Sequence, residues 1–187
     1  MFVPSKVFFT KGVGVHKEKL VSFEMALRDA HVSPFNLVTV SSIMPPNARI
    51  VPRDEGLSEL HAGEIVFCVM ARAETNVEGE SVAASVGLAV PPFEQGHHGF
   101  LSEHHAAGLT EEECGIHAED LAATMLGSLM NVDIDPKAAW NEREQAYLAS
   151  GKIIKTSNIS SSAVCRDGLW TTVVSLAVFV PSYKFLF

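Results

Sequence analysis

"GLWTTVVSLAVFV", residues 168–180, is the stretch of sequence that decides the fold. After the opening glycine most of its residues are β-branched or aromatic, and none is charged. A strand with one solvent-exposed face alternates apolar and polar residues, whereas a strand covered on both faces is apolar almost throughout. The stretch therefore predicts a central strand of a sheet that is covered on both sides.

Shorter runs on either side predict a mixed domain of strands and helices. Leu20, Phe23 and Leu27 fall near one face of a helix over residues 17–30. Thr110 is a suitable N-cap, with Glu113 three residues later, for a helix that reaches residues 125–130. Strands are expected at residues 6–9 (ended by Lys11-Gly12), 36–40, 64–73, 85–91, 99–103 and 152–161, with residues 81–84 open to either state, and a short helix from Asp135-Pro136. Separate strands and helices indicate an α+β class.

Composition limits the kind of protein. The 187 residues are 47% hydrophobic and 19% charged, which indicates one folded domain. The net charge of −8, without a basic stripe, argues against a nucleic-acid partner. No apolar run is long enough to cross a membrane and the N-terminus lacks a secretion-signal pattern, so we expect a cytoplasmic protein with no membrane partner. Cys68, Cys114 and Cys165 are too widely spaced for a zinc site and are expected to be buried thiols.

Two histidine pairs, His97-His98 and His104-His105, lie near acidic residues but do not predict a metal site. Adjacent side chains in a strand point to opposite faces, whereas metal ligands must converge. The HExxH and HxH spacings are absent. We expect no metal, and a polar loop with one or two functional histidines.

The segment "TVSSIMPPNARIVP", residues 39–52, places two serines between a strand and a stiff proline stretch. Pro45, Pro46 and Pro52 exclude a helix here and favour an extended path. A serine hydroxyl can attack the carbonyl of the preceding residue and turn the amide into an ester, if the surrounding structure holds the backbone in place. Removal of the α-proton would then split the chain and leave a dehydroalanine, which hydrolyses to a pyruvoyl group. A capped strand end is the plainer interpretation of the same residues.

The sequence resembles the pyruvoyl-dependent arginine decarboxylase family. "VSSIMPPNARIVP" is similar to the segment at which that family cleaves itself, between the two residues before Ile-Met-Pro-Pro. "SFEMALRDAHVSPFNLVTVSSIMPP", "GESVAASVGLAVPP" and "GFLSEHHAAG" resemble further family segments. The similarity covers about residues 20–129 and a strand near the C-terminus. It implies a four-layer αββα sandwich of mixed or antiparallel sheets flanked by helices.

The resemblance implies a role for each matching residue of the cleavage segment. Ser42 would become the covalent pyruvoyl cofactor, and Ser41 would end a β chain of residues 1–41, leaving an α chain of residues 42–187. Asn36 matches an asparagine that assists cleavage. Glu103 matches the catalytic glutamate that protonates the α-carbon after carbon dioxide leaves the Schiff base with the substrate. Near neutral pH a carboxylic acid donates a proton only when burial or neighbouring groups raise its pKa.

The resemblance also implies a substrate pocket. Glu24 stands where the family has an acid, usually Asp, that pairs with the guanidinium of the substrate, and a carboxylate can take that group in a bidentate way. Ser33, Phe35 and Ile43 match positions that line the pocket, although Ser33 replaces the more familiar Gly. Glu24 is one methylene longer than Asp, which leaves the depth of the pocket open.

The implied activity is decarboxylation of L-arginine to agmatine by a trimer or hexamer of αβ protomers, with each active site between neighbours. Agmatine would feed polyamine synthesis or remove protons in acid. Two alternatives stay open. The same cofactor could act on lysine, histidine or aspartate, of which aspartate fits Glu24 poorly. The chain could instead be a non-catalytic homologue that serves as an oligomeric subunit. Residues 131–150 have no assigned function beyond a surface excursion or a subunit contact.

Overall fold

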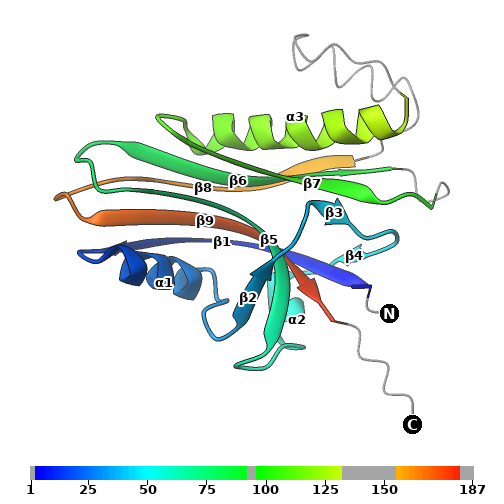
Figure 1. Cartoon of the computed structure of the whole chain (residues 1–187), viewed down its shortest axis with the longest axis horizontal. Helices are drawn as coiled ribbons and strands as arrows, with labels where there is room; N and C mark the ends of the chain where they lie inside the picture. Colours follow the sequence, from blue (N-terminus) through cyan, green and yellow to red (C-terminus); the bar gives the residue numbers. More distant parts are fainter. Residues whose placement is uncertain (1–2, 92–95, 132–154, 182–187) are drawn as a thin grey trace.

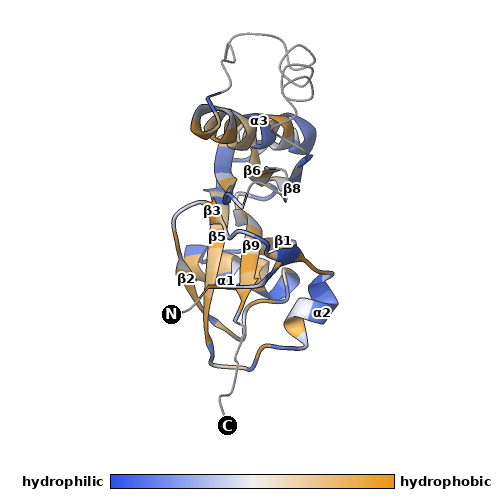
Figure 2. Cartoon of the chain, turned by 90° about the vertical axis from the view of Figure 1, so that its right-hand side faces the viewer, coloured by the Kyte–Doolittle hydropathy of each residue, from blue (hydrophilic) through white to orange (hydrophobic). Residues whose placement is uncertain are grey.

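The computed structural model describes residues 3–91, 96–131 and 155–181, in which two β-sheets are stacked between helices (Figures 1 and 2). The five-stranded sheet has the order β2-β5-β9-β1-β4, and the four-stranded sheet has the order β3-β7-β6-β8. The elements are β1 (Lys6–His16), α1 (Lys19–Asp29), β2 (Asn36–Thr39), β3 (Ile43–Met44), β4 (Arg49–Ile50), α2 (Arg53–Leu57), β5 (Ile65–Thr75), β6 (Ser81–Val90), β7 (Gly99–Ala107), α3 (Glu111–Leu129), β8 (Lys155–Val164) and β9 (Trp170–Val180). Within these ranges no helix is long and apolar enough to cross a membrane.

Strand β9 is the middle strand of the larger sheet, as its apolar sequence predicts. It pairs in antiparallel fashion with β1 on one side and β5 on the other, with Val173 opposite both Val13 and Ala73. Every residue of β9 from Thr171 to Val180 is buried. Burial of both faces explains why this strand lacks the polar alternation of a half-exposed strand.

Three apolar clusters hold four layers together. Val69, Leu88, Leu101 and Val173 belong to the cluster between the two sheets. A second cluster lies between the larger sheet and the helices α1 and α2, and a third lies under α3. Seen from the side, α3 covers the outer face of the smaller sheet while α1 and α2 cover the larger one (Figure 2). The expected αββα sandwich is confirmed.

The first strand is longer than the sequence predicts. The expected end at Lys11-Gly12 is wrong, because β1 continues to His16. Gly12 and Gly14 belong to the strand face on which α1 packs. A Cβ atom built on Gly14 would lie 2.0 Å from the carbonyl oxygen of Ser22, so only glycine allows the helix backbone to approach so closely.

Gly14→Ala is therefore expected to lower the free energy of unfolding by about 3 kcal/mol, because α1 must move away from β1. Urea unfolding at one fixed protein concentration measures the change. The control is Val15→Thr on the same strand, where Val15 is 40% exposed. This control is expected to change stability by less than about 0.5 kcal/mol. Equal stability of Gly14→Ala and the parent chain would contradict the close packing.

Other differences from the predicted elements are local. Residues 81–84 belong to strand β6, which settles the open choice. The expected exclusion of helix around Pro52 is wrong in one detail, because α2 starts directly after it. Proline is tolerated at a helix start, where its missing N–H has no partner within the helix anyway. The short helix expected at Asp135-Pro136 and most of residues 131–150 lie outside the described ranges.

Helix α3 begins as predicted. The Thr110 side chain accepts the N–H of Glu113, and the Glu113 carboxylate accepts the N–H of Thr110, which together form a capping box. The N–H of Thr110, and next its hydroxyl, donate to the Glu113 carboxylate and lower the pKa of Glu113. The helix is thereby fixed at the end of β7, the strand that carries Glu103.

Candidate active site

Ser41 and Ser42 lie where the chain crosses from one sheet to the other (Figure 1). Before them, β2 pairs in parallel with β5 of the larger sheet, and the N–H of Val40 still donates to the carbonyl of Cys68 at 3.0 Å. After them, β3 pairs with β7 of the smaller sheet, with Ile43 opposite Phe100. The serine pair is thus held at both ends by different sheets.

Three hydrogen bonds fix the polar atoms of the pair. The Ser42 hydroxyl donates to Oε2 of Glu103 at 2.7 Å. The N–H of Leu101 donates to the Ser42 carbonyl at 2.9 Å, and the N–H of Ile43 donates to the Ser41 carbonyl at 2.8 Å. The last bond spans two residues and closes a tight turn centred on Ser42. The hydroxyl therefore has a carboxylate as acceptor, and each neighbouring carbonyl has a backbone donor.

Glu103 reaches Ser42 because of the alternation of strand β7. Leu101 and Glu103 project from the same face of β7, and Leu101 is buried between the two sheets. Farther along the strand Glu103 is exposed, because β3 pairs only with Gly99 and Phe100 and no other described strand pairs with that edge of β7. The described residues of one chain thus leave this carboxyl group exposed.

An apolar cavity of about 370 Å³ adjoins the serine pair. Ser41 and Ile43 line it together with the aromatic rings of Phe67 and Phe179. Ile43 is 38% exposed and forms part of this wall, and its place in a substrate pocket stays a prediction. The hollow offers apolar surface directly next to the bond between Ser41 and Ser42.

The cysteines do not provide a competing nucleophile. All three are buried free thiols, as expected. Burial, with a smaller effect of the negative charge on Glu103, raises the pKa of Cys68 to about 12. Burial raises the pKa of Cys114 to about 11. Both thiols therefore stay protonated at neutral pH, and the thiolate form that reacts is scarce.

The remaining predicted residues lie on the face of the larger sheet that α1 covers, or on its edge strand β2. Glu24 is on α1, where it accepts the Arg28 guanidinium at 2.8 Å. Phe35 packs against the second apolar cluster, which lies between the larger sheet and the helices α1 and α2. Ser33 is half-buried in the turn before Phe35. The Asn36 amide donates to the carbonyl of Gly63 at 2.8 Å. Since β2 runs from Asn36 toward the serines, its length separates that amide from Ser42 within one chain.

His104, directly after Glu103, does not face it. His104 occupies the opposite face of β7, where its ring contacts that of His117 on α3 with centroids 4.2 Å apart. Burial, followed by the neighbouring His117 and His105, lowers the pKa of His104. His98 packs edge-on against Phe100. Among the described residues no group of three or more His, Cys, Asp or Glu could hold a metal.

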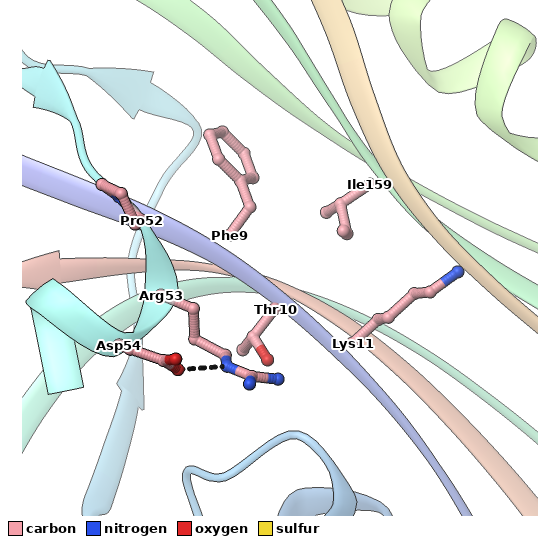
Figure 3. A pocket seen from close by; sticks show the side chains of 7 residues that line it. All are labelled: Phe9, Thr10, Lys11, Pro52, Arg53, Asp54 and Ile159. Atoms are coloured by element: carbon pink, nitrogen blue, oxygen red, sulfur yellow. Dashed lines mark hydrogen bonds and ion pairs between the residues drawn. The ribbon is translucent and has the colours of Figure 1, made fainter.

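A second hollow, of about 270 Å³, lies at the opposite edge of the two sheets, between β1, the start of α2 and β8 (Figure 3). Phe9 and Ile159 form its apolar walls, and Arg53 donates to Asp54 at 3.1 Å along its rim. Its lining includes none of the predicted site residues. This hollow therefore gives no support to a site built from the predicted residues.

Comparison with known proteins identifies the family of the chain. The model of the family "Pyruvoyl-dependent arginine decarboxylase (PvlArgDC)" matches residues 6–184. The chain belongs to this family. It is 54% identical over 180 residues to a "Probable pyruvoyl-dependent arginine decarboxylase" of Chlorobium limicola, which covers 96% of this chain and 99% of the relative. It is 51% identical over 181 residues to "Pyruvoyl-dependent arginine decarboxylase 2" of Methanosarcina mazei, with 96% and 98% covered.

Membership of the pyruvoyl-dependent arginine decarboxylase family makes the chain an enzyme and implies a covalent pyruvoyl group. The residues fit such a group, because a serine with a carboxylate acceptor follows a carbonyl that is itself held by hydrogen bonding. The sequence does not predict one hydrogen bond of this site, which the backbone N–H of Leu101 donates to the Ser42 carbonyl. The pairing of β3 with β7 brings that N–H to Ser42. The pattern of side chains in the sequence does not reveal which strands pair.

Proposed function

We propose that the chain cleaves itself between Ser41 and Ser42, and that the processed enzyme converts L-arginine to agmatine and carbon dioxide. One observation carries this proposal: the Ser42 hydroxyl donates to the Glu103 carboxylate at 2.7 Å before any cleavage has occurred. A hydroxyl becomes a nucleophile when a base accepts its proton, and the base must lie within hydrogen-bond reach. Glu103 meets this geometric requirement.

The first step is a shift of the acyl group from nitrogen to oxygen. Glu103 accepts the proton of the Ser42 hydroxyl, and the oxygen attacks the carbonyl carbon of Ser41. The carbon–nitrogen bond then breaks, the nitrogen takes up the proton that Glu103 accepted, and an ester replaces the amide. Negative charge develops on the Ser41 carbonyl oxygen during the attack. The Ile43 N–H that donates to this oxygen at 2.8 Å stabilises that charge.

The second step divides the chain. A base removes the α-proton of residue 42, the bond between its Cβ and the ester oxygen breaks, and Ser41 leaves as a carboxylate. Residue 42 is then a dehydroalanine, which takes up water and releases ammonia to become the pyruvoyl group. The products are a fragment of residues 1–41 and a fragment that starts at position 42.

In turnover the pyruvoyl ketone supplies an electrophile that binds the amine of the substrate and accepts the electrons left by carbon dioxide. Glu103 then returns a proton to the α-carbon. Glu24 binds the guanidinium of the substrate. Its contact with Arg28 supports this role, because the guanidinium of Arg28 is the same chemical group, held by both carboxylate oxygens at 2.8 Å and 3.0 Å.

The active site is completed between neighbouring protomers of a trimer or hexamer. Two features of the single chain support this arrangement. Glu103 is exposed at an uncovered strand edge. Glu24, Ser33 and Asn36 lie away from Ser42, on α1 and on the segment that follows it. A neighbour that brings its own α1 region to the Ser42 edge would bury Glu103 and supply the guanidinium site.

The experiment that tests this function measures carbon dioxide released by the purified protein from arginine, lysine, histidine and aspartate separately. Release from arginine is expected to exceed release from each other amino acid, because the guanidinium can use both oxygens of Glu24. Preference for lysine would keep the cofactor chemistry and replace the substrate. No release from any of the four, with an intact chain on a denaturing gel, would favour a non-catalytic subunit.

Glu24→Gln is expected to raise KM for arginine by about 10- to 100-fold, because a charge-assisted bidentate pair is lost. The value of kcat should change much less, because Glu24 binds the guanidinium, which is at the other end of the substrate from the reacting α-carbon. Steady-state kinetics on the processed enzyme separate the two parameters. Glu18→Gln, at the exposed start of the same helix, is the matched control and should leave both unchanged. An unchanged KM in Glu24→Gln would remove Glu24 from the pocket.

A further inference from the structure

The backbone N–H of Leu101 donates to the carbonyl oxygen of Ser42 at 2.9 Å. The proposed function gives Glu103 and Ser42 their roles but leaves this donor without one. We propose that the Leu101 N–H stabilises negative charge on the Ser42 carbonyl oxygen, first in the elimination step of self-cleavage and again during decarboxylation. This inference deepens the proposed function and rests on it.

The elimination step places charge on this particular oxygen. When a base takes the α-proton of residue 42, the electron pair left on Cα spreads onto the adjacent carbonyl, whose oxygen becomes an enolate. The pair then forms the double bond between Cα and Cβ, and the bond from Cβ to the ester oxygen breaks. Ser41 carries the electrons of that bond away as its carboxylate. A donor already aimed at the enolate oxygen lowers this barrier without any rearrangement.

The donor is held rigidly by the fold. Leu101 is completely buried in the core between the sheets, so its side chain fixes the position of its N–H. On one side β7 pairs with β6 from Ala107 back to Phe100, and on the other side it pairs with β3 (Figure 1). The same strand therefore supplies two groups to residue 42: a carboxylate from the Glu103 side chain and a donor from the Leu101 backbone.

The hydrogen bond also suits the second reaction. Cleavage breaks the chain before residue 42, so the carbonyl of residue 42 stays bonded to Ile43 and keeps its place beside Leu101. That carbonyl is adjacent to the ketone carbon made from the old Cα. Electrons released by carbon dioxide can spread onto its oxygen as they did in the elimination. One backbone donor thus serves the making of the cofactor and its use.

The test replaces Leu101 by its α-hydroxy acid analogue during translation of the full chain. This exchange turns one amide N–H into an ester oxygen and keeps the leucine side chain. The acyl shift should proceed normally, because it puts no charge on the Ser42 carbonyl. Elimination should be about 100-fold slower, the usual effect of losing one such donor. The ester between residues 41 and 42 should therefore accumulate. Hydroxylamine cleaves it as well as the introduced ester before residue 101, and the mass of the hydroxamate of residues 1–41 reports the cleavage at residues 41 and 42.

A matched control makes the same exchange at Ala106, on the same strand and opposite Ala83 of β6. This analogue should process and turn over like the parent chain. For the processed fraction of the Leu101 analogue, kcat with arginine should fall by about 100-fold while KM stays unchanged. A merely structural effect of the ester would appear in the Ala106 analogue as well.

Three results would overturn the inference: elimination at the parent rate, arrest before the ester between residues 41 and 42 forms, or an equal defect in the Ala106 analogue. Failure of the proposed function looks different. In that case the unaltered chain itself stays in one piece, whereas failure of the inference leaves the unaltered chain processed and the Leu101 analogue equally fast.

Discussion

Ser42→Ala is expected to leave the chain as one polypeptide of 187 residues without decarboxylase activity. The variant lacks the oxygen that attacks the Ser41 carbonyl, so no ester forms and no pyruvoyl group appears. The parent chain should instead give two fragments, residues 1–41 and 42–187. The larger one should resist Edman degradation, because a pyruvoyl group has no free amine. Mass spectrometry of the denatured proteins measures both outcomes.

Two further serine variants make this result specific. Ser162→Ala changes a half-buried serine of β8 in the other serine run of the sequence and should be processed normally. Ser41→Ala should still be cleaved, because residue 41 contributes only a backbone carbonyl to the reaction. Cleavage of Ser42→Ala would refute the assignment of the nucleophile. Loss of cleavage in Ser162→Ala would show that serine variants fail for a general reason such as misfolding.

Most of the fold could be predicted because its strongest signals are local. The apolar run of β9 and the capping box at Thr110 depend on residues close in sequence, and the structure places both as expected. The end of β1 could not be predicted in the same way. Lys11-Gly12 resembles a strand end, yet Gly12 and Gly14 are strand residues that make room for α1. That reason lies in a contact with a distant segment of the chain.

Serines in β8 illustrate the same limit. The run Ser160-Ser161-Ser162 is polar, as is typical of a surface strand or loop, yet its first two residues are buried. Ser160 shares a hydrogen bond of 2.7 Å with Ser85 on β6, which satisfies both hydroxyls inside the protein. A hydroxyl that is paired in this way can be buried at little cost. The partner is 75 positions away, and no local pattern reveals it.

For the candidate site, the sequence and the resemblance name Ser42 and Glu103, and the structure brings these two together across 61 positions of the chain. The pairing of β3 with β7 achieves this, and neither strand shows its partner in its own sequence. Glu24, Ser33 and Asn36 remain apart from Ser42 in one chain, so their predicted roles depend on a neighbouring protomer. The contribution of Leu101 comes from its backbone, which every residue has, and becomes visible only in three dimensions.

Glu103→Gln is expected to slow the acyl shift and to lower kcat of any processed enzyme by at least about 100-fold. A glutamine can still accept the hydrogen bond of the Ser42 hydroxyl, which is 2.7 Å long in the parent chain, so the local geometry should persist. It cannot accept the proton, and general acid–base catalysis typically contributes a factor of about 10² to 10⁴. Fragment masses followed over time measure the first effect, and carbon dioxide release from arginine measures the second.

The matched control for this substitution is Glu112→Gln, an exposed glutamate in the first turn of α3. It removes the same charge from another part of the surface and should leave processing and turnover unchanged. Processing of Glu103→Gln at the parent rate would show that another group takes the Ser42 proton. Normal turnover with slow processing would confine Glu103 to the making of the cofactor, and the opposite pattern would confine it to protonation of the α-carbon. The rates of processing and of turnover, measured on one variant, thus separate the two proposed roles of Glu103: accepting the Ser42 proton and protonating the α-carbon.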